Sequence, residues 1–437
     1  MKIQRPPTIN DTPVQALKAD IAALTVEQNG NYLHWDELRH RPARDAITHV
    51  EWWSLIKFAR KRDQKLLPLR DAGERHFYFL MTDSVQRVIH EIDRDASGRI
   101  ELPEDIANPT TRDHYSVNSL VEEAFRSSQL EGASTTRPVA KEMFRNRREP
   151  RTRSERMIVN NFHAMEWVRE HQNKPLTAKL LCELHAIITN DTLDSADAAG
   201  RFRRADEQAH VVDPNDGDTV HIPPPASQLN ERVQRLCEFA NGKTSDEPFV
   251  HPVVRAILVH FWLAYDHPFV DGNGRTARAL FYWSMLRQGY WLTEFISISR
   301  VIQKARTQYD KAFIHAETDD NDATYFIVNQ LRVVRQAIDD LVVYLKRKAR
   351  EVRDVEKALD GSSELNHRQL ALLSQFVRKS EARITIAGHQ LEQRVAYQTA
   401  RTDLLELVQR GFLLQRKVGK KMFFSPVAEL KRKLALR

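Results

Sequence analysis

The stretch HPFVDGNGRTAR, residues 267–278, decides how we interpret the rest of this chain. It follows an apolar, aromatic-rich segment, residues 253–265, whose composition predicts a buried helix. It then runs directly into a second helical pattern at residues 276–286. We therefore expect the stretch to be a loop between two helices.

Within this loop the sequence favours binding of phosphate. Gly272 and Gly274 have no Cβ, so the backbone around Asn273 can approach a ligand closely and turn its N–H groups inward. These N–H groups come at the start of the next helix, where unpaired donors and the helix dipole favour an anion. Arg275 and Arg278 lie three residues apart and add charged donors on one face. The pattern predicts a site for more than one phosphate.

Two further side chains in the same stretch can carry chemistry. Asp271 offers a hard oxygen ligand of the kind that holds Mg²⁺ together with nucleotide phosphates. His267 can accept a proton near neutral pH. Taken singly, a histidine is usually structural, a Gly-Asn-Gly is usually a turn, and charges at a helix start are usually caps. Their combination within twelve residues indicates nucleotide chemistry.

The whole stretch resembles the motif HxFx[D/E]GNGRxxR of the Fic family, with every specified position matched. Members of that family most often transfer AMP from ATP to a protein hydroxyl. The resemblance implies that His267 is the general base and that Phe269 anchors the loop in the core. It also implies a set of ligand-binding residues: Asp271 for Mg²⁺, Gly272, Asn273 and Gly274 for the α- and β-phosphates, and Arg275 and Arg278 for the β- and γ-phosphates.

A second family pattern lies upstream. Residues 116–132, SVNSLVEEAFRSSQLEG, have helical periodicity and end at Gly132, which suits the position after a helix C-terminus. Ser127 and Glu131 are four residues apart and share a face, a pairing that by itself indicates only a solvated helix. The segment also resembles the [S/T]xxxE[G/N] signature of the family's inhibitory helix. By this resemblance, Glu131 pairs with Arg278 and occupies the position of the γ-phosphate.

The segment at residues 207–223 changes character. Two short β-prone runs flank a Pro-Asn-Asp-Gly turn, which predicts a hairpin in an otherwise helical chain. In Fic proteins such a hairpin, the flap, binds an extended target segment along its backbone edge by β-augmentation. The resemblance implies a target-docking role for His210, Val211, Val212, Val220, His221 and Ile222.

The C-terminal part, residues 361–437, is expected to be a winged helix-turn-helix domain. Helical patterns at residues 368–379 and 386–395 and from Tyr397 onward precede two β-prone runs, which is the order of a winged helix. The segment holds 15 lysines and arginines against six acidic residues, which suits contact with DNA phosphates. Many winged helices bind proteins instead, so both partners stay open. The candidate DNA contacts on the leading turn are Gln398, Thr399 and Arg401.

With 437 residues, two or three domains are expected. The predicted fold class is mainly α, with a Fic-type helical core that carries a small hairpin flap. Residues 1–110 are assigned to an N-terminal helical accessory region, in which residues 76–95 are also expected to be helical. Residues 111–355 are assigned to the catalytic core.

The composition favours a cytoplasmic protein. Cys182 and Cys237 both occur in apolar helical settings, which indicates reduced thiols and no disulfide framework. The first residues contain no apolar signal region, and no run of 18 apolar residues occurs.

The expected function is transfer of AMP from Mg²⁺-ATP to a Ser, Thr or Tyr hydroxyl of a protein target, and of the chain itself, under inhibition by Glu131. Two alternatives stay open. One is removal of AMP, in which Glu131 aligns a water molecule. The other is a DNA-binding transcriptional regulator whose core modifies itself. The preferred nucleotide, the target protein and the existence of a homodimer are not fixed by the sequence.

Overall fold

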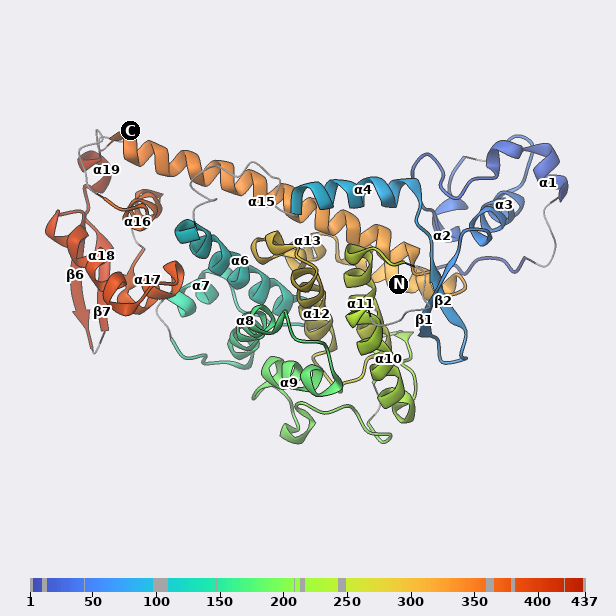
Figure 1. Ribbon diagram of the computed structural model, residues 1–437, viewed down its shortest axis with the longest axis horizontal. Coiled ribbons are helices and arrows are strands. Elements are labelled where there is room, and N and C mark those ends of the chain that lie inside the picture. The colour runs from blue at the N-terminus through green and yellow to red at the C-terminus, as the bar shows by residue number, and fades with distance from the viewer. Residues whose placement is uncertain are drawn as a thin grey trace. The chain divides into compact units, whose positions relative to one another are not determined.

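The computed structural model describes residues 3–9, 14–42, 44–96, 109–145, 148–207, 209–212, 217–242, 249–358, 365–378, 382–419 and 421–434 (Figure 1). The described chain is mainly helical, as expected, with three small sheets. It divides into two compact units. Unit 1 comprises Met1–Gly98, His163–Thr293 and Ile298–Gln336, and unit 2 comprises Arg99–Phe162, Glu294–Ser297 and Ala337–Arg437.

The N-terminal part of unit 1 combines helices with one β-hairpin. Its elements are α1 (Val14–Ala19), η1 (Ile21–Ala23), α2 (Trp35–Leu38), α3 (His49–Lys61), β1 (Lys65–Arg70), β2 (His76–Phe79) and α4 (Asp83–Arg94). A capping box fixes the start of α3, because Thr48 accepts from the Glu51 amide and Glu51 accepts from the Thr48 amide.

The prediction of a helix across residues 76–95 is wrong at its start. His76–Phe79 is strand β2, paired antiparallel with β1, and only α4 within this range is α-helical. The aromatic residues of this run favour a strand, because their side chains pack well on a half-buried pleated surface. Phe77 of β2 packs edge-on against Phe261 and Tyr265, with ring centroids 5.4 and 4.9 Å apart.

A buried polar network joins this N-terminal part to the later helices of unit 1. The Arg60 guanidinium, 1% exposed, lies 3.6 Å from the ring of Tyr32 and donates to the Tyr325 hydroxyl at 2.7 Å. The Tyr325 hydroxyl donates to Asp319 at 2.8 Å, and Lys57 donates to the same carboxylate at 2.7 Å. Residues some 265 positions apart in the chain are thereby fixed in one compact body.

The rest of unit 1 is built around two consecutive helices, α11 (Pro252–Asp266) and α12 (Asn273–Arg287), which pack on each other. Both are buried on nearly every face, as expected for helices at the centre of a domain. The elements around them are α9 (Ala178–Thr189), η3 (Ala196–Ala198), β3 (Val211–Val212), β4 (Thr219–His221), η4 (Ala226–Gln228), α10 (Leu229–Asn241), α13 (Ile298–Lys304) and α14 (Arg306–Thr318). The loop of interest is therefore held between two buried helices.

Two helices, α8 (Arg153–His171) and α15 (Thr324–Ala358), belong partly to each unit. The apolar pattern of residues 293–300 predicts one helix over that range, and this prediction is wrong. The chain forms a 3-10 turn, η5 (Trp291–Phe295), and α13 starts only at Ile298. Leu292, Phe295 and Ile296 are all buried, so the apolar positions do not follow a single helical face.

Unit 2 contains α6 (Pro109–Leu130), α7 (Arg137–Arg145), α16 (His367–Arg378), β5 (Ile384–Thr385), α17 (Ile386–Gln393), α18 (Tyr397–Gln409), β6 (Leu413–Val418), β7 (Lys421–Pro426) and α19 (Leu430–Lys433). The three C-terminal helices and the hairpin that we predicted are confirmed. Strand β5 was not predicted; it pairs with β7 to give the order β5-β7-β6. The buried cluster of this part includes Leu373, Leu404 and Phe424. Among the described residues, no helix is long and apolar enough to span a bilayer.

Candidate active site

The loop between α11 and α12 begins at His267, as the sequence predicts. His267 ends α11 in the left-handed conformation, with φ 46°, and its amide donates to the Leu263 carbonyl. Its ring Nδ1 lies 3.3 Å from the Ala264 carbonyl oxygen, a contact that requires the proton on Nδ1. In the neutral ring the lone pair is then on Nε2, which leaves that atom as the proton acceptor.

The side chain of Asn273 closes the loop. Its Oδ1 accepts from the Phe269 amide at 2.9 Å, and its Nδ2 donates to the Phe269 carbonyl at 2.8 Å. Phe269 itself is fully buried. Because two hydrogen bonds hold the amide group of Asn273 inside the loop, we expect the backbone N–H of this residue to make the predicted phosphate contact.

Gly272 is required at its position for two reasons. It caps α12 in the left-handed region, with φ 82° and ψ 2°. A Cβ there would also lie 2.8 Å from Cγ2 of Thr189 and 3.3 Å from Nε2 of His185. No side chain fits between the loop and α9.

One residue that shapes the loop, His185 of α9, was not predicted as a site residue. Its ring stacks on Phe269, with centroids 3.7 Å apart and planes 3° apart. The Gly200 amide donates to Nδ1 at 3.0 Å, so Nε2 carries the proton and donates to the Asp271 carbonyl at 2.8 Å. Burial lowers the pKa of His185 to about 4, which keeps the ring neutral. Its only sequence signal is the apolar period of α9, which does not distinguish it from a core residue.

The two arginines of the motif are buried, at 1% and 2% exposure for Arg275 and Arg278. Arg275 donates to the Ile188 carbonyl at 3.2 Å and lies 3.5 Å from the Asp271 carboxylate. Burial lowers the pKa of His260 to about 3, and the positive charge of Arg278 contributes in the same direction. Both guanidinium groups are thus held in the interior beside the first turn of α12, where helix N–H groups also favour an anion.

Asp271 is half-exposed at the mouth of the loop. One carboxylate oxygen accepts from the Gly272 amide at 2.5 Å, and the other faces Arg275. Within the described ranges, no three His, Cys, Asp or Glu side chains gather as a metal site. A single carboxylate fits an ion that takes its other ligands from phosphates and water, as Mg²⁺ does in nucleotide sites.

The predicted hairpin is confirmed at β3 and β4, which pair antiparallel. Of its candidate docking residues, Val211 and Val212 form β3, Val220 and His221 lie in β4, His210 precedes β3, and Ile222 follows β4. Val212 and Ile222 are 51% and 66% exposed. Residues 213–216, at the predicted turn, lie outside the described residues.

His221 attaches the hairpin to α11. Its Nε2 lies 2.7 Å from the Tyr265 carbonyl oxygen, and its Nδ1 lies 2.8 Å from the Glu317 carboxylate. Both contacts are satisfied at once by the protonated ring. Burial disfavours that form, but the hydrogen bond and charge of Glu317 outweigh it, so the pKa of His221 is raised.

Arg203 makes a second attachment. It donates from Nε to the His267 carbonyl at 2.9 Å and also donates to the Pro224 carbonyl, just after the hairpin.

The remaining predicted residues lie in unit 2. Ser127 is buried on α6, Glu131 follows the last helical residue, and Gly132 has φ 89°, as its predicted position after the helix requires. The pairing of Glu131 with Arg278 stays a prediction. Gln398, Thr399 and Arg401 lie on the first turn of α18, as expected, and their contact with DNA also stays a prediction.

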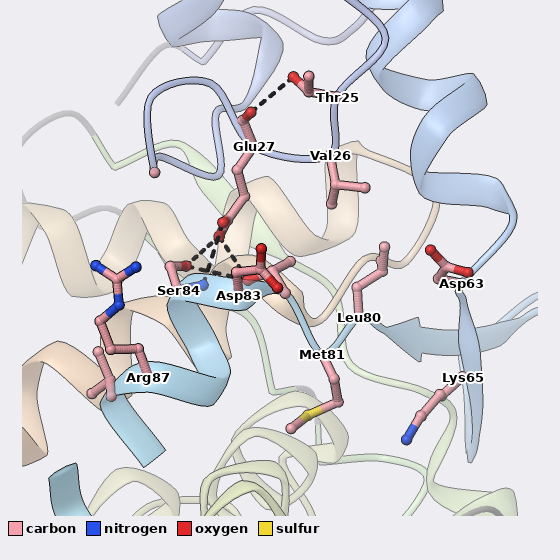
Figure 2. Close-up of a pocket in the computed structure, with 13 residues that line it drawn as sticks. Thr25, Val26, Glu27, Asp63, Lys65, Leu80, Met81, Asp83, Ser84 and Arg87 are labelled. Atoms are coloured by element: carbon pink, nitrogen blue, oxygen red, sulfur yellow. Dashed lines mark hydrogen bonds between the residues drawn. The ribbon is translucent and has the colours of Figure 1, made fainter. Parts of the chain in front are cut away.

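A separate cavity of about 790 Å³ lies in the N-terminal part of unit 1, and its lining residues fall between positions 25 and 88 (Figure 2). Glu27 projects into it and accepts from the Thr82 hydroxyl at 2.6 Å and the Ser84 amide at 3.4 Å. A carboxylate thereby occupies the N-terminus of α4, where an anionic ligand would otherwise be favoured. No residue of the motif at 267–278 lines this cavity, so the volume of a cavity does not by itself identify the candidate active site.

Comparison with known proteins places the motif in a family. Residues 175–285 match the Fic/DOC family, and this range includes α9, the hairpin, α11, the loop and most of α12. The segment that carries the motif is therefore similar to a Fic domain.

Its curated relatives include the protein adenylyltransferases Fic of Drosophila willistoni, 35% identical over 119 residues, and Drosophila melanogaster, 37% identical over 119 residues. Each match covers 27% of this chain, and 21% and 22% of the respective relative. The matched segment thus spans about a fifth of the length of these relatives.

Solved structures similar to this chain include a Fic family protein from Desulfovibrio desulfuricans G20, with a TM-score of 0.48 and 17% identity. That match covers 80% of this chain and 97% of the other. Another is a fragment of Fic-1 from C. elegans, with a TM-score of 0.47, 16% identity and coverage of 72% and 81%.

Proposed function

We propose that this chain transfers AMP from ATP to a Ser, Thr or Tyr hydroxyl of a protein target, and to itself. The observation that supports the proposal most directly is the construction of the loop. The acceptor nitrogen of His267, the half-exposed Asp271 and the first turn of α12 are fixed within twelve residues by buried contacts. The Drosophila relatives, which are named protein adenylyltransferases, support the same reaction.

In the proposed reaction, His267 removes the proton from the target hydroxyl through Nε2. The hydroxyl oxygen forms a bond to the α-phosphorus, the bond between that phosphorus and the oxygen bridging to the β-phosphate breaks, and pyrophosphate leaves. The N–H groups of Asn273 and Gly274 and the guanidinium groups of Arg275 and Arg278 bind the phosphates. The Gly272 N–H, which donates to Asp271 in the structure, must turn from that carboxylate to join them. Asp271 would hold Mg²⁺, which supplies neutralisation of phosphate charge when bound.

Incubation of the full chain with labelled ATP tests this reaction. Transfer of AMP predicts that protein becomes labelled from ATP carrying the label in the α-phosphate and stays unlabelled from ATP carrying it in the γ-phosphate. Labelling from the γ-position alone would mean phosphoryl transfer and would contradict the proposal. Mass spectrometry of a lysate incubated with each of the four nucleoside triphosphates identifies the nucleotide and the modified hydroxyl.

We further propose that Glu131 inhibits the reaction by pairing with Arg278 and taking the place of the γ-phosphate. The sequence pattern of Ser127, Glu131 and Gly132 supports this, together with the end of α6 just before Glu131. A charge-assisted hydrogen bond contributes about 1.5–3 kcal/mol, so Glu131→Gly should increase self-modification roughly tenfold to a hundredfold. The double variant Glu131→Gly, Arg278→Ala should lose this gain. Equal labelling of the wild type and Glu131→Gly would contradict inhibition while leaving the transferase assignment intact.

A second activity, binding of DNA by the C-terminal domain as a winged helix, is favoured by the order of its elements. Three helices precede the hairpin, β5 completes a three-stranded sheet, and Gln398 and Arg401 are exposed on the first turn of α18. Replacement of both by alanine should weaken binding of the full chain to duplex DNA in a salt-dependent assay. Unchanged binding would exclude α18 as the recognition helix.

A further inference from the structure

Unit 2 contains a cavity of about 390 Å³ that no motif of the sequence indicates. Its walls come from α6 and α7, from the C-terminal half of α15, and from α16 and α17. Six cationic side chains line it: Arg137, Lys141 and Arg145 on α7, Arg347 and Lys348 on α15, and Arg378 on α16. Cations from three helices therefore meet at one concavity.

The acidic residues at this cavity do not balance its cations. The lining includes one carboxylate, Glu392, which binds Arg145 at 2.9 Å. From outside the lining, Glu122 binds Arg137 at 2.7 Å. Glu351 binds Lys348 at 2.9 Å, lies 3.7 Å from Arg347 and also pairs with Arg378. Among the pairs that the described residues form, these three carboxylates against the six cations leave a formal excess of three positive charges. A concave, partly desolvated surface concentrates the field of such an excess.

Neutral polar side chains also line the cavity. Asn118, Ser374 and Gln375 line it, together with the hydroxyl of Tyr344. Burial raises the pKa of Tyr344 to about 12, so this hydroxyl stays protonated and can donate. A volume of about 390 Å³ is within the range of small-molecule sites and cannot admit a nucleic acid duplex.

We propose that this cavity binds a small anion that carries two or more phosphate groups. A planar guanidinium can make two parallel hydrogen bonds to one anionic group. Several arginines in one pocket therefore match a ligand with several phosphate groups better than a ligand with a single carboxylate. Cations contributed by three different helices suit a ligand with more than one charged group, such as a diphosphate.

Binding of this anion would tie the C-terminal domain more firmly to α6 and α7. Helix α17 packs on both of these helices. At Gly388 the approach is so close that a Cβ would lie 1.8 Å from the Arg145 carbonyl oxygen, and the Thr385 hydroxyl donates to the same oxygen at 3.2 Å. An anion that bridges Lys141 and Arg145 of α7 to Arg347 of α15 and Arg378 of α16 adds charged contacts to this packing. If the proposed inhibition by Glu131 holds, the anion acts on the helix that positions this residue.

Calorimetric titration of the full chain with inorganic pyrophosphate tests the site without requiring activity. The titration uses an Arg278→Ala background without divalent cations, so that binding to the motif loop is weakened. We expect binding that weakens with salt and that the double variant Lys141→Gln, Arg347→Gln reduces at least about tenfold. Arg350→Gln serves as the matched control, because Arg350 is exposed on the same helix but does not line the cavity. No binding in the Arg278→Ala background, or equal affinity in the double variant and the control, would overturn the proposal.

Hydrogen exchange tests the consequence for packing. At pyrophosphate ten times above its Kd, exchange of the amides in α7 and α17 should slow by up to about tenfold, and the Lys141→Gln, Arg347→Gln variant should lose this protection. Because this readout does not depend on catalysis, failure of the transferase assignment would leave it unchanged. Exchange rates that are the same with and without bound pyrophosphate would contradict the proposal that the anion strengthens the packing of the C-terminal domain on α7.

Discussion

The motif loop and the flap lie next to each other in unit 1 but are built in opposite ways. Each part of the loop is fixed by buried contacts: Asn273 clamps Phe269, His185 holds the Asp271 carbonyl, and Gly272 fits against Thr189. The flap has strands of two and three residues with exposed apolar side chains, and it is attached by His221 and Arg203. This contrast fits a division in which the loop fixes the reacting groups and the flap adapts to a target.

The largest expected effect comes from the loop. His267→Ala removes the proposed base and should lower the rate of AMP transfer by about 10² to 10⁴. Binding of ATP should change little, because the phosphates are bound by other groups. Single-turnover labelling combined with equilibrium binding of ATP separates the two effects. Wild-type turnover in this variant would exclude His267 as the base.

The next largest effect is expected at Gly272, where a control variant separates the cost of steric crowding from the cost of the left-handed backbone. Gly272→Ala should destabilise the chain by about 2–4 kcal/mol, because a left-handed φ and a contact of 2.8 Å with Thr189 both oppose a Cβ. Gly289 is the matched control, since it has φ 86° and open space around its Cβ position. Gly289→Ala should cost only about 1–2 kcal/mol. Equal costs, measured by chemical denaturation, would mean that the packing against Thr189 contributes nothing.

A smaller, pH-dependent effect is expected at the flap. The folded-state pKa of His221 is raised, so its contribution to stability is fully present below the ordinary histidine pKa and is lost as the pH rises through the folded value. Buried histidines with lowered pKa, such as His185, act with the opposite sign. The difference in Tm between the wild type and His221→Gln, followed from about pH 6 upward, isolates the contribution of His221 and should shrink with rising pH. A difference that does not vary with pH would exclude a charged His221.

The smallest effect on stability is expected at the exposed edge. Ile222→Ser should change the free energy of unfolding by less than about 0.5 kcal/mol, because Ile222 is 66% exposed. If the flap docks the target, the KM for a protein substrate should rise while the affinity for ATP stays the same. An unchanged KM would place target binding elsewhere.

The sequence predicts those features that have a local cause. The helices on both sides of the loop follow from their apolar period, and the left-handed Gly272 and Gly132 follow from their positions at helix ends. His185 and Arg203 escaped prediction because their partners lie 86 and 64 residues away, where no local pattern reaches. Strand β2 was missed although its aromatic residues favour a strand, because it adjoins the strongly periodic α4.

The two hydrogen bonds of the Asn273 side chain also affect the chemical stability of the chain over time. An asparagine followed by glycine is prone to lose ammonia, because the next backbone nitrogen can attack the side-chain amide carbon and form a cyclic imide. In the folded chain that amide is held by two hydrogen bonds to Phe269 and is 2% exposed, which keeps it out of the geometry of attack. When the chain unfolds, the protection ends, and conversion to aspartate places a negative charge inside the phosphate-binding loop. Time spent unfolded thus becomes an irreversible chemical loss of active molecules.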